Sequence, residues 1–262
     1  MMMVDRELLR WYFVHRMVLE SVWNMPKNAA TSYRVLARTV LQRAEPFAHM
    51  AKPTLDRMCE SGRLLALRPG EALFHSGDRV DSLTVVIDGA LDVSTIGSSG
   101  KRHVVMCLAP GQITNLIPVL DDQPALHDVH AHGEAVVMQL PKPDVLQAID
   151  DEPGLARAFS RLLCLRSRAL YGTVAHSALL PLRTRCAKLV LSLMETYGRE
   201  EDGATLIALK LSQGDLADML GCTRQSVNRE LKLFEREGVL RMSYSHFVVL
   251  DAPRLGVFAE AA

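Results

Sequence analysis

The chain has 262 residues, of which 48% are hydrophobic, and it carries 30 basic and 30 acidic side chains. This length and composition fit about two packed domains, and a formal net charge of zero is mild evidence against a nucleic-acid binder. No apolar run approaches the ~18 residues of a membrane-spanning helix, and charges interrupt the aromatic N-terminal stretch too early for a signal peptide. The five cysteines include no C-x-x-C pair, so we expect a reduced, cytoplasmic protein without structural zinc or an iron–sulfur cluster.

Residues 1–44 form a first segment with two helical patterns, separated by Asn24-Met25-Pro26-Lys27-Asn28. The segment is interpreted either as a helical extension that binds a partner or, in part, as residues upstream of the true start. The sequence leaves both interpretations open.

Residues 45–151 form a second segment in which short apolar runs alternate with turn signals such as Asp88-Gly89 and Pro110-Gly111. The runs predict strands at 64–67, 72–74, 83–87, 90–95, 103–108 and 135–140. Short strands separated by glycine-centred turns predict a small barrel or roll.

Residues 152–177 are predicted to form one long helix, because their apolar positions alternate in steps of three and four. Over three heptads this spacing is that of a coiled-coil seam and favours dimerisation. The predicted seam consists of Leu155, Ala158, Leu162, Leu165, Ala169, Gly172 and His176. Phe159, Leu163 and Leu170 flank it and are expected to pack on the roll. A helix packed only on its own domain is the alternative.

Residues 178–262 contain the strongest local pattern of the chain, at 212–238. Ser212 is placed to cap one helix, with an acidic capping-box partner three residues later. Gly221 follows at the position of a left-handed helix terminator, and Thr223 is placed to cap a second helix. Two helices joined by a short turn that contains glycine predict a helix-turn-helix.

The polar face of the second predicted helix suits the edges of DNA bases. Arg224, Gln225, Asn228 and Arg229 lie at i, i+1, i+4 and i+5, so their side chains project together. Arginine pairs with guanine in the major groove, and glutamine or asparagine pairs with adenine. The remaining predicted DNA-binding residues are Thr223 and two expected phosphate contacts, Gln213 and Ser226. An ordinary surface helix with a mixed charged face is the alternative.

Three further elements are expected around the helix-turn-helix. An apolar helix at 185–197 supports it, and a polar, acidic loop follows at 198–203. Weak alternation at 239–250 predicts a small hairpin, which would be the wing of a winged helix. His246 in this hairpin is interpreted either as a phosphate contact or as a solvated turn residue.

The order of roll, long helix and winged helix resembles the Crp/Fnr family of bacterial transcription regulators over about residues 45–250. The roll carries Arg68-Pro69-Gly70-Glu71, and residues 221–229 read GCTRQSVNR, which is similar to the family's GCSRETVGR. The resemblance implies an α+β fold with an N-terminal β-roll of the cyclic-nucleotide-binding type, a dimerisation helix and a C-terminal winged helix-turn-helix. It also implies that Arg224, Gln225 and Arg229 read bases. Because Gln225 replaces a glutamate of that pattern, the preferred central base should differ.

The roll departs from the cyclic-nucleotide-binding members of the family at two places. Those members have a Gly-Glu pair for the ribose and, farther along, an Arg-Ser or Arg-Thr pair for the phosphate. Here these places fall on Asn115-Leu116 and Leu126-His127. Leucine binds neither group, and a buried phosphate without a cation is costly, so we expect no cyclic-AMP binding and no required cofactor. The remaining pocket, filled by side chains or holding haem or another apolar ligand, is expected to involve Ile113, Leu116, Ile117, Val119, Leu126 and His127.

His127, His130 and His132 invite a metal or haem interpretation. On a strand, however, residues 130 and 132 share one face and residue 127 lies on the other. We therefore expect no metal site and interpret these residues as solvated or core histidines. Cys222 in the predicted turn is either a packed cysteine or a site whose oxidation weakens DNA binding.

Together these patterns predict a homodimeric transcription regulator that binds a palindromic operator in double-stranded DNA. RNA polymerase is the expected further partner if the protein activates transcription, and no membrane partner is expected. The alternative is a ligand sensor or a haem or redox sensor of the same fold that acts through protein contacts. The sequence has no P-loop, no Ser/His/Asp order with an elbow and no paired carboxylates in a glycine-rich site, so we expect no enzyme.

Overall fold

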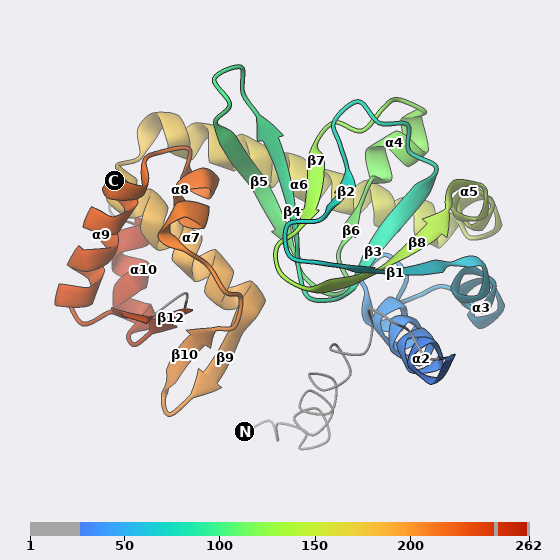
Figure 1. The fold of residues 1–262 in the computed structure, drawn as a ribbon, viewed down its shortest axis with the longest axis horizontal. Coiled ribbons are helices and arrows are strands. Elements are labelled where there is room, and N and C mark those ends of the chain that lie inside the picture. The colour runs from blue at the N-terminus through green and yellow to red at the C-terminus, as the bar shows by residue number, and fades with distance from the viewer. Residues whose placement is uncertain (1–26, 244–245, 261–262) are drawn as a thin grey trace.

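The computed structural model describes residues 27–243 and 246–260, and the predicted first helical pattern before residue 27 lies outside these ranges. An N-terminal β-roll, a long helix and a C-terminal winged helix follow one another along the chain (Figure 1). The predicted α+β fold is therefore confirmed.

The roll contains eight strands and four helices among the described residues. The strands are β1 (Arg63–Leu67), β2 (Ala72–Phe74), β3 (Ser82–Asp88), β4 (Leu91–Ile96), β5 (Arg102–Leu108), β6 (Ile113–Thr114), β7 (Asp128–Ala131) and β8 (Ala135–Pro141). The helices are α2 (Lys27–Arg43), α3 (Lys52–Ser61), α4 (Leu116–Asp121) and α5 (Lys142–Asp151). The sequence predicted six of the strands but neither β6, which has two residues, nor β7, in which Asp128 and His130 break the apolar run.

Two antiparallel sheets build the roll, with strand orders β1-β8-β3-β6 and β2-β7-β4-β5. Side chains from both sheets, such as Val86, Leu91 and Val137, form one buried cluster. A larger cluster lies between the first sheet and the helices. The order of the second sheet sets β7 and β5 on either side of β4, which matters for the polar cluster described below.

Helix α2 packs on the roll. Its side chains Tyr33, Ala37 and Leu41 are fully buried in the larger cluster. The ring of Phe47, just beyond α2, meets Phe159 edge-on with centroids 5.9 Å apart. The described part of the segment 1–44 thus contributes to the roll's own core instead of extending from it as a separate arm.

The predicted long helix is α6 (Pro153–Leu179), and it runs behind the roll towards the winged helix (Figure 1). Leu155 is buried in the roll core and Leu162 packs against that core, so these two predicted seam residues do not face outwards. Leu170 was expected to pack on the roll but is exposed. The first half of α6 therefore serves the roll, and the second half projects beyond it. Among the described residues, no helix is both long and apolar enough to cross a membrane.

The C-terminal domain is built on a four-stranded sheet of order β11-β12-β10-β9. Its elements are α7 (Leu182–Tyr197), β9 (Gly198–Glu201), β10 (Ala204–Ile207), α8 (Gln213–Leu220), α9 (Arg224–Arg236), β11 (Leu240–Ser243), β12 (His246–Val249) and α10 (Ala252–Glu260). The loop predicted at 198–203 is wrong, because this segment forms edge strand β9 and a turn in which Asp202 and Gly203 have positive φ. Every residue of β9 is exposed, so the strand lacks the alternation that would reveal it.

Candidate DNA-binding surface

Helices α8 and α9 begin and end where the local sequence predicts. The Ser212 hydroxyl accepts a hydrogen bond from the Asp215 amide at 3.1 Å, and the Asp215 carboxylate accepts one from the Ser212 amide at 2.7 Å. Gly221 ends α8 with a φ of 66°. The Thr223 hydroxyl accepts from the Ser226 amide at 3.2 Å and caps α9. These caps satisfy amide groups that a helix start otherwise leaves unpaired.

Apolar packing fixes which face of α9 points outwards. Val227, Leu231 and Phe234 of α9 are buried against Leu216 and Ala217 of α8. Burial of each large side chain contributes ~1.5–3 kcal/mol. The side of α9 opposite this stripe is therefore held towards solvent.

Arg224, Gln225 and Arg229 lie exposed on that outward side, as predicted. Asn228 differs, since it is half-buried and its amide oxygen is buried without a hydrogen-bond partner. The amide oxygen of Asn228 therefore does not lie on the same open surface as the two arginines.

The two expected phosphate contacts, Gln213 and Ser226, are half-buried, whereas the predicted DNA-binding residue Thr223 is exposed. The hydroxyls of Thr223 and Ser226 lie 2.9 Å apart and bond each other. All three residues lie at the starts of α8 and α9, where free amide groups and the helix dipole favour anions.

Glu230 supports the outward face, although it is not among the residues predicted from the sequence. Its buried carboxylate accepts from Arg183 Nε on α7 and from Arg229 Nε, each at 3.2 Å. This contact orients Arg229, whose side chain stays 72% exposed. The sequence did contain a signal for Glu230, because an acidic residue three positions after Val227 lies on the helix face that was predicted to be buried.

Strands β11 and β12 form the predicted wing. They pair antiparallel, and Ser243 lies opposite His246 at the end of the ladder. The tip at residues 244–245 lies outside the described residues. His246 is half-buried at the start of β12, and its expected phosphate contact stays a prediction.

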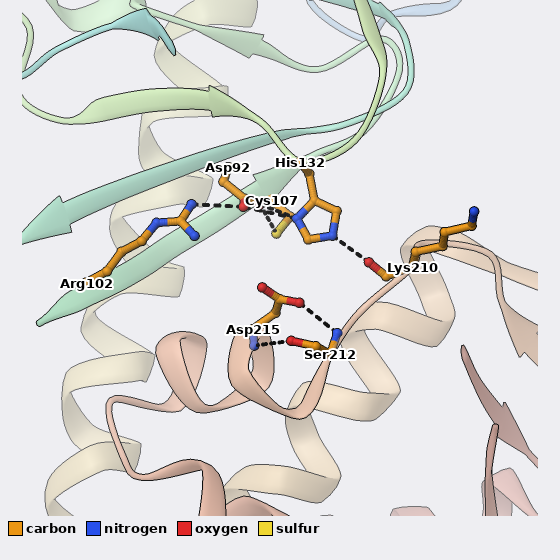
Figure 2. Close-up of polar contacts among 7 residues, drawn as sticks. All are labelled: Asp92, Arg102, Cys107, His132, Lys210, Ser212 and Asp215. Atoms are coloured by element: carbon orange, nitrogen blue, oxygen red, sulfur yellow. Dashed lines mark hydrogen bonds and ion pairs between the residues drawn. The ribbon is translucent and has the colours of Figure 1, made fainter. Parts of the chain in front are cut away.

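The roll contacts both ends of α8. Lys101 Nζ donates to the Gly221 carbonyl at 2.9 Å, and His103 Nδ1 lies 2.7 Å from the Asp218 carbonyl oxygen. At the other end, His132 Nε2 lies 2.6 Å from the carbonyl oxygen of Lys210 (Figure 2). The sequence had no local signal for these contacts, because each joins residues more than 70 positions apart.

Asp92 holds the other nitrogen of His132. His132 Nδ1 lies 3.0 Å from each Asp92 carboxylate oxygen. Burial lowers the pKa of His132, but the hydrogen bond and charge of Asp92 outweigh it and raise this pKa to about 8. For the acid Asp92 burial acts in the opposite direction and raises the pKa, but hydrogen bonds from His132, Cys107 and Arg102 outweigh it and lower this pKa to about 2.

The predicted effector residues do not line one pocket. Ile113, Leu116 and Val119 are buried in the roll core, whereas Ile117 is 43% and Leu126 is 53% exposed. Helix α4 separates Leu116 from Ile117, since consecutive residues of a helix point in different directions, whereas Leu126 lies between α4 and β7.

The three predicted histidines also lie apart. Burial lowers the pKa of half-buried His127, whose Nδ1 has no hydrogen-bond partner. The ring of His130 lies against His75 with centroids 5.8 Å apart. His132 alone turns towards Asp92.

A cavity of about 800 Å³ lies between α2, β5 and α6. Its walls include Met106, Leu108 and Leu162, with Arg43 and Arg166 among the polar residues. The Arg166 guanidinium donates to the Ile113 carbonyl, and burial lowers the pKa of Arg166. Of the predicted effector residues, only Ile113 contributes to this cavity.

Comparison with known families matches both halves of the chain. Residues 64–152 match the cyclic nucleotide-binding domain, and residues 184–257 match the Crp-like helix-turn-helix domain. Together these matches cover more than half of the chain. A roll joined by a long helix to a winged helix with an exposed, cationic recognition face defines a helix-turn-helix transcription regulator. The chain belongs to the Crp/Fnr family.

Individual relatives are distant but span most of the chain. A CRP-like cAMP-activated global transcriptional regulator of Mycobacterium tuberculosis is 22% identical over 216 residues, which are 82% of this chain and 96% of that protein. The nitrogen fixation regulation protein FixK of Bradyrhizobium diazoefficiens is 25% identical over 205 residues, covering 76% of this chain and 83% of that protein. The solved structure of FixK2 from Bradyrhizobium japonicum superposes with a TM-score of 0.69 at 20% identity, covering 77% of this chain and 98% of that one.

Proposed function

We propose that two copies of the chain bind a palindromic operator and regulate transcription from it. Each α9 would enter a major groove, and the two grooves would lie about 34 Å apart on one side of the DNA. The observation that carries this proposal is the exposed set Arg224, Gln225 and Arg229 on a fully capped helix. RNA polymerase is the expected second partner if the protein activates transcription.

The second half of α6 supports the homodimer. Leu165 is 59% and Leu179 is 78% exposed on this helix. Large apolar side chains gathered on one element favour a protein contact. A second copy of α6 would cover them, with Ala169, Gly172 and His176 in the same seam, and would give the two-fold symmetry of a palindromic site.

Cyclic AMP is not the proposed effector, although the relative from Mycobacterium tuberculosis is named as cAMP-activated. Leu116, at the place of the ribose-binding acid, is buried in the core, and Leu126, at the place of the phosphate-binding arginine, is exposed and uncharged. Neither side chain offers a charge or hydrogen bond to a cyclic phosphate.

The effector that fits this chain is an apolar molecule with one anionic group, in the cavity between α2, β5 and α6. Apolar walls and the guanidinium of Arg166 suit such a molecule. Haem is a weaker candidate, because none of the described residues that line this cavity is a histidine.

Selection of bound DNA from a pool of random sequences tests the regulator proposal and requires no known operator. The expected product is a two-fold sequence whose half-sites are centred about 10 base pairs apart. If no sequence is enriched, the alternative of a sensor that acts only through protein contacts takes its place. A single, non-repeated half-site would contradict the dimer.

A further inference from the structure

Three side chains from neighbouring strands of the roll bring potential metal ligands together. Asp92 on β4 pairs directly with Cys107 on β5, and His132 follows β7 on the other side of β4. Cys107 Sγ and His132 Nδ1 each lie 3.0 Å from the same oxygen, Asp92 Oδ1. The three ligand atoms all lie within 4.8 Å of one another (Figure 2).

We propose that Asp92 Oδ1, Cys107 Sγ and His132 Nδ1 bind a zinc ion. Carboxylate, thiolate and imidazole are the ligand types of protein zinc sites, with bonds of ~2.0–2.3 Å. A tetrahedral ion with such bonds holds its ligand atoms ~3.3–3.7 Å apart. The two separations from Asp92 Oδ1, 3.0 Å each, need to widen by only a few tenths of an ångström, and the third, between Cys107 Sγ and His132 Nδ1, is at most 4.8 Å.

The two proposed ligands Asp92 and His132 already have the outer hydrogen-bond partners that orient metal ligands. Arg102 Nη2 donates to the other Asp92 oxygen, Oδ2, at 2.9 Å, so Oδ1 is left for the metal. His132 Nε2 faces the Lys210 carbonyl oxygen at 2.6 Å. A metal-bound histidine usually donates its second N–H to such a carbonyl, which fixes the ring and its tautomer.

Charge and protons balance when zinc enters. Without metal, the thiol proton of Cys107 and the Nδ1 proton of His132 point at Asp92 Oδ1. Zinc replaces both protons, which pass to solvent, and forms bonds to sulfur, nitrogen and oxygen. The thiolate and the carboxylate neutralise the two charges of the ion, and no oxidant or reductant is involved.

A cavity gives the ion a route to the site. It has a volume of about 450 Å³ and is lined by Asp92 and His132 from the roll and by Asp215 from α8. The carboxylate of Asp215 lies across this cavity from Asp92 and His132 (Figure 2). We place the fourth coordination position on this side, where water can fill it, as in zinc sites with three protein ligands.

The site lies where the roll holds the helix-turn-helix. Lys210, whose carbonyl His132 contacts, comes two residues before the cap of α8. Zinc at Nδ1 keeps the proton of His132 on Nε2 and so maintains the bond to Lys210. The site thus adjoins the contact between roll and α8, and this contact stays intact when the ion replaces the Nδ1 proton, independently of any effector in the larger cavity.

Zinc titration of the full-length chain tests the proposal. The protein is stripped with EDTA and titrated with zinc chloride against a chromophoric chelator. We expect one ion per chain, and Cys107→Ser or His132→Ala should weaken binding by more than the ~10–100-fold that loss of an outer hydrogen-bond partner costs. His103→Ala removes another contact between roll and α8, and Cys164→Ser removes an exposed thiol; both should bind zinc as the unaltered chain does.

A second measurement needs no variant and decides the matter if the variants do not fold. Zinc should protect Cys107 of the unaltered chain from alkylation, as read by peptide mass spectrometry, whereas Cys164 should react equally with and without zinc. Cobalt in place of zinc should give a thiolate-to-metal absorption band. Zinc affinity that is equal in the unaltered chain and in Cys107→Ser, or alkylation of Cys107 that zinc does not slow, would overturn the proposal. His132 would then be simply an imidazolium between two acceptors.

Discussion

Helix α9 and helix α4 put opposite chemistry at their surfaces. On α9, Arg224, Gln225 and Arg229 are exposed, and buried Glu230 supports one of them. At α4, a leucine fills the core and the nearby exposed side chains include Ile117 and Leu126. The first surface suits polar recognition and the second suits packing. The comparison teaches that membership of the family does not by itself imply both a DNA-binding surface and a nucleotide-binding surface, because each surface depends on its own side chains.

The largest expected effect comes from removing the packing behind α9. Phe234→Ala should lower the free energy of unfolding of the winged helix by ~3–5 kcal/mol, because it leaves a cavity in a buried cluster. Leu120→Ala on α4, where the side chain is exposed, should change it by less than ~0.5 kcal/mol. Urea unfolding followed by circular dichroism measures both. Equal effects would mean that the two helices are not packed as described.

The next effect concerns DNA affinity. Arg224→Ala and Arg229→Ala should each cost ~1–3 kcal/mol, or roughly 5–150-fold in dissociation constant, through lost contacts to bases. Arg79→Ala, an exposed arginine of the roll, is the matched control and should leave affinity unchanged. Fluorescence anisotropy on the selected operator gives all three values. Unchanged affinity in both α9 variants would remove the DNA assignment.

A smaller effect is expected at the helix caps. Ser212→Ala breaks the capping box of α8 and should destabilise the domain by ~1 kcal/mol. Ser160→Ala on α6 is a control, since its hydroxyl bonds only the carbonyl four residues earlier on an exposed face. Thermal unfolding of both variants compares them. A Ser212→Ala protein as stable as the unaltered chain would show that the cap contributes nothing here.

The smallest effect is expected from cyclic AMP itself. Calorimetry should detect no micromolar site, and the ligand should not raise the unfolding temperature, because a ligand stabilises only the state it binds. A tight site would contradict the interpretation of Leu116 and Leu126 and would make α4 a recognition surface after all.

The difference between the helix-turn-helix and the region around α4 also explains which features could be predicted from the sequence. The caps at Ser212 and Thr223 and the terminator Gly221 act within one turn of the chain, so local patterns revealed them. The division of the predicted pocket residues between core and surface was not foreseen, because α4 was not predicted and a helix sends Leu116 and Ile117 to different sides.

The contacts between residues far apart in the chain could not be predicted from the sequence for a different reason. Asp92 and His132 are 40 residues apart and meet only because β7 pairs with β4. No spacing rule within one segment reports such a meeting. The contacts of Lys101 and His103 with α8 likewise depend on how the roll and the winged helix dock.

The most direct test of the central claim, that α9 reads DNA bases, is parallel operator selection with the unaltered protein and with Gln225→Glu. Glutamine favours adenine, whereas glutamate accepts from cytosine. The account predicts two-fold operators of the same half-site spacing, which differ at one base pair in each half-site. Identical operators for both proteins, or no enrichment for either, would contradict it.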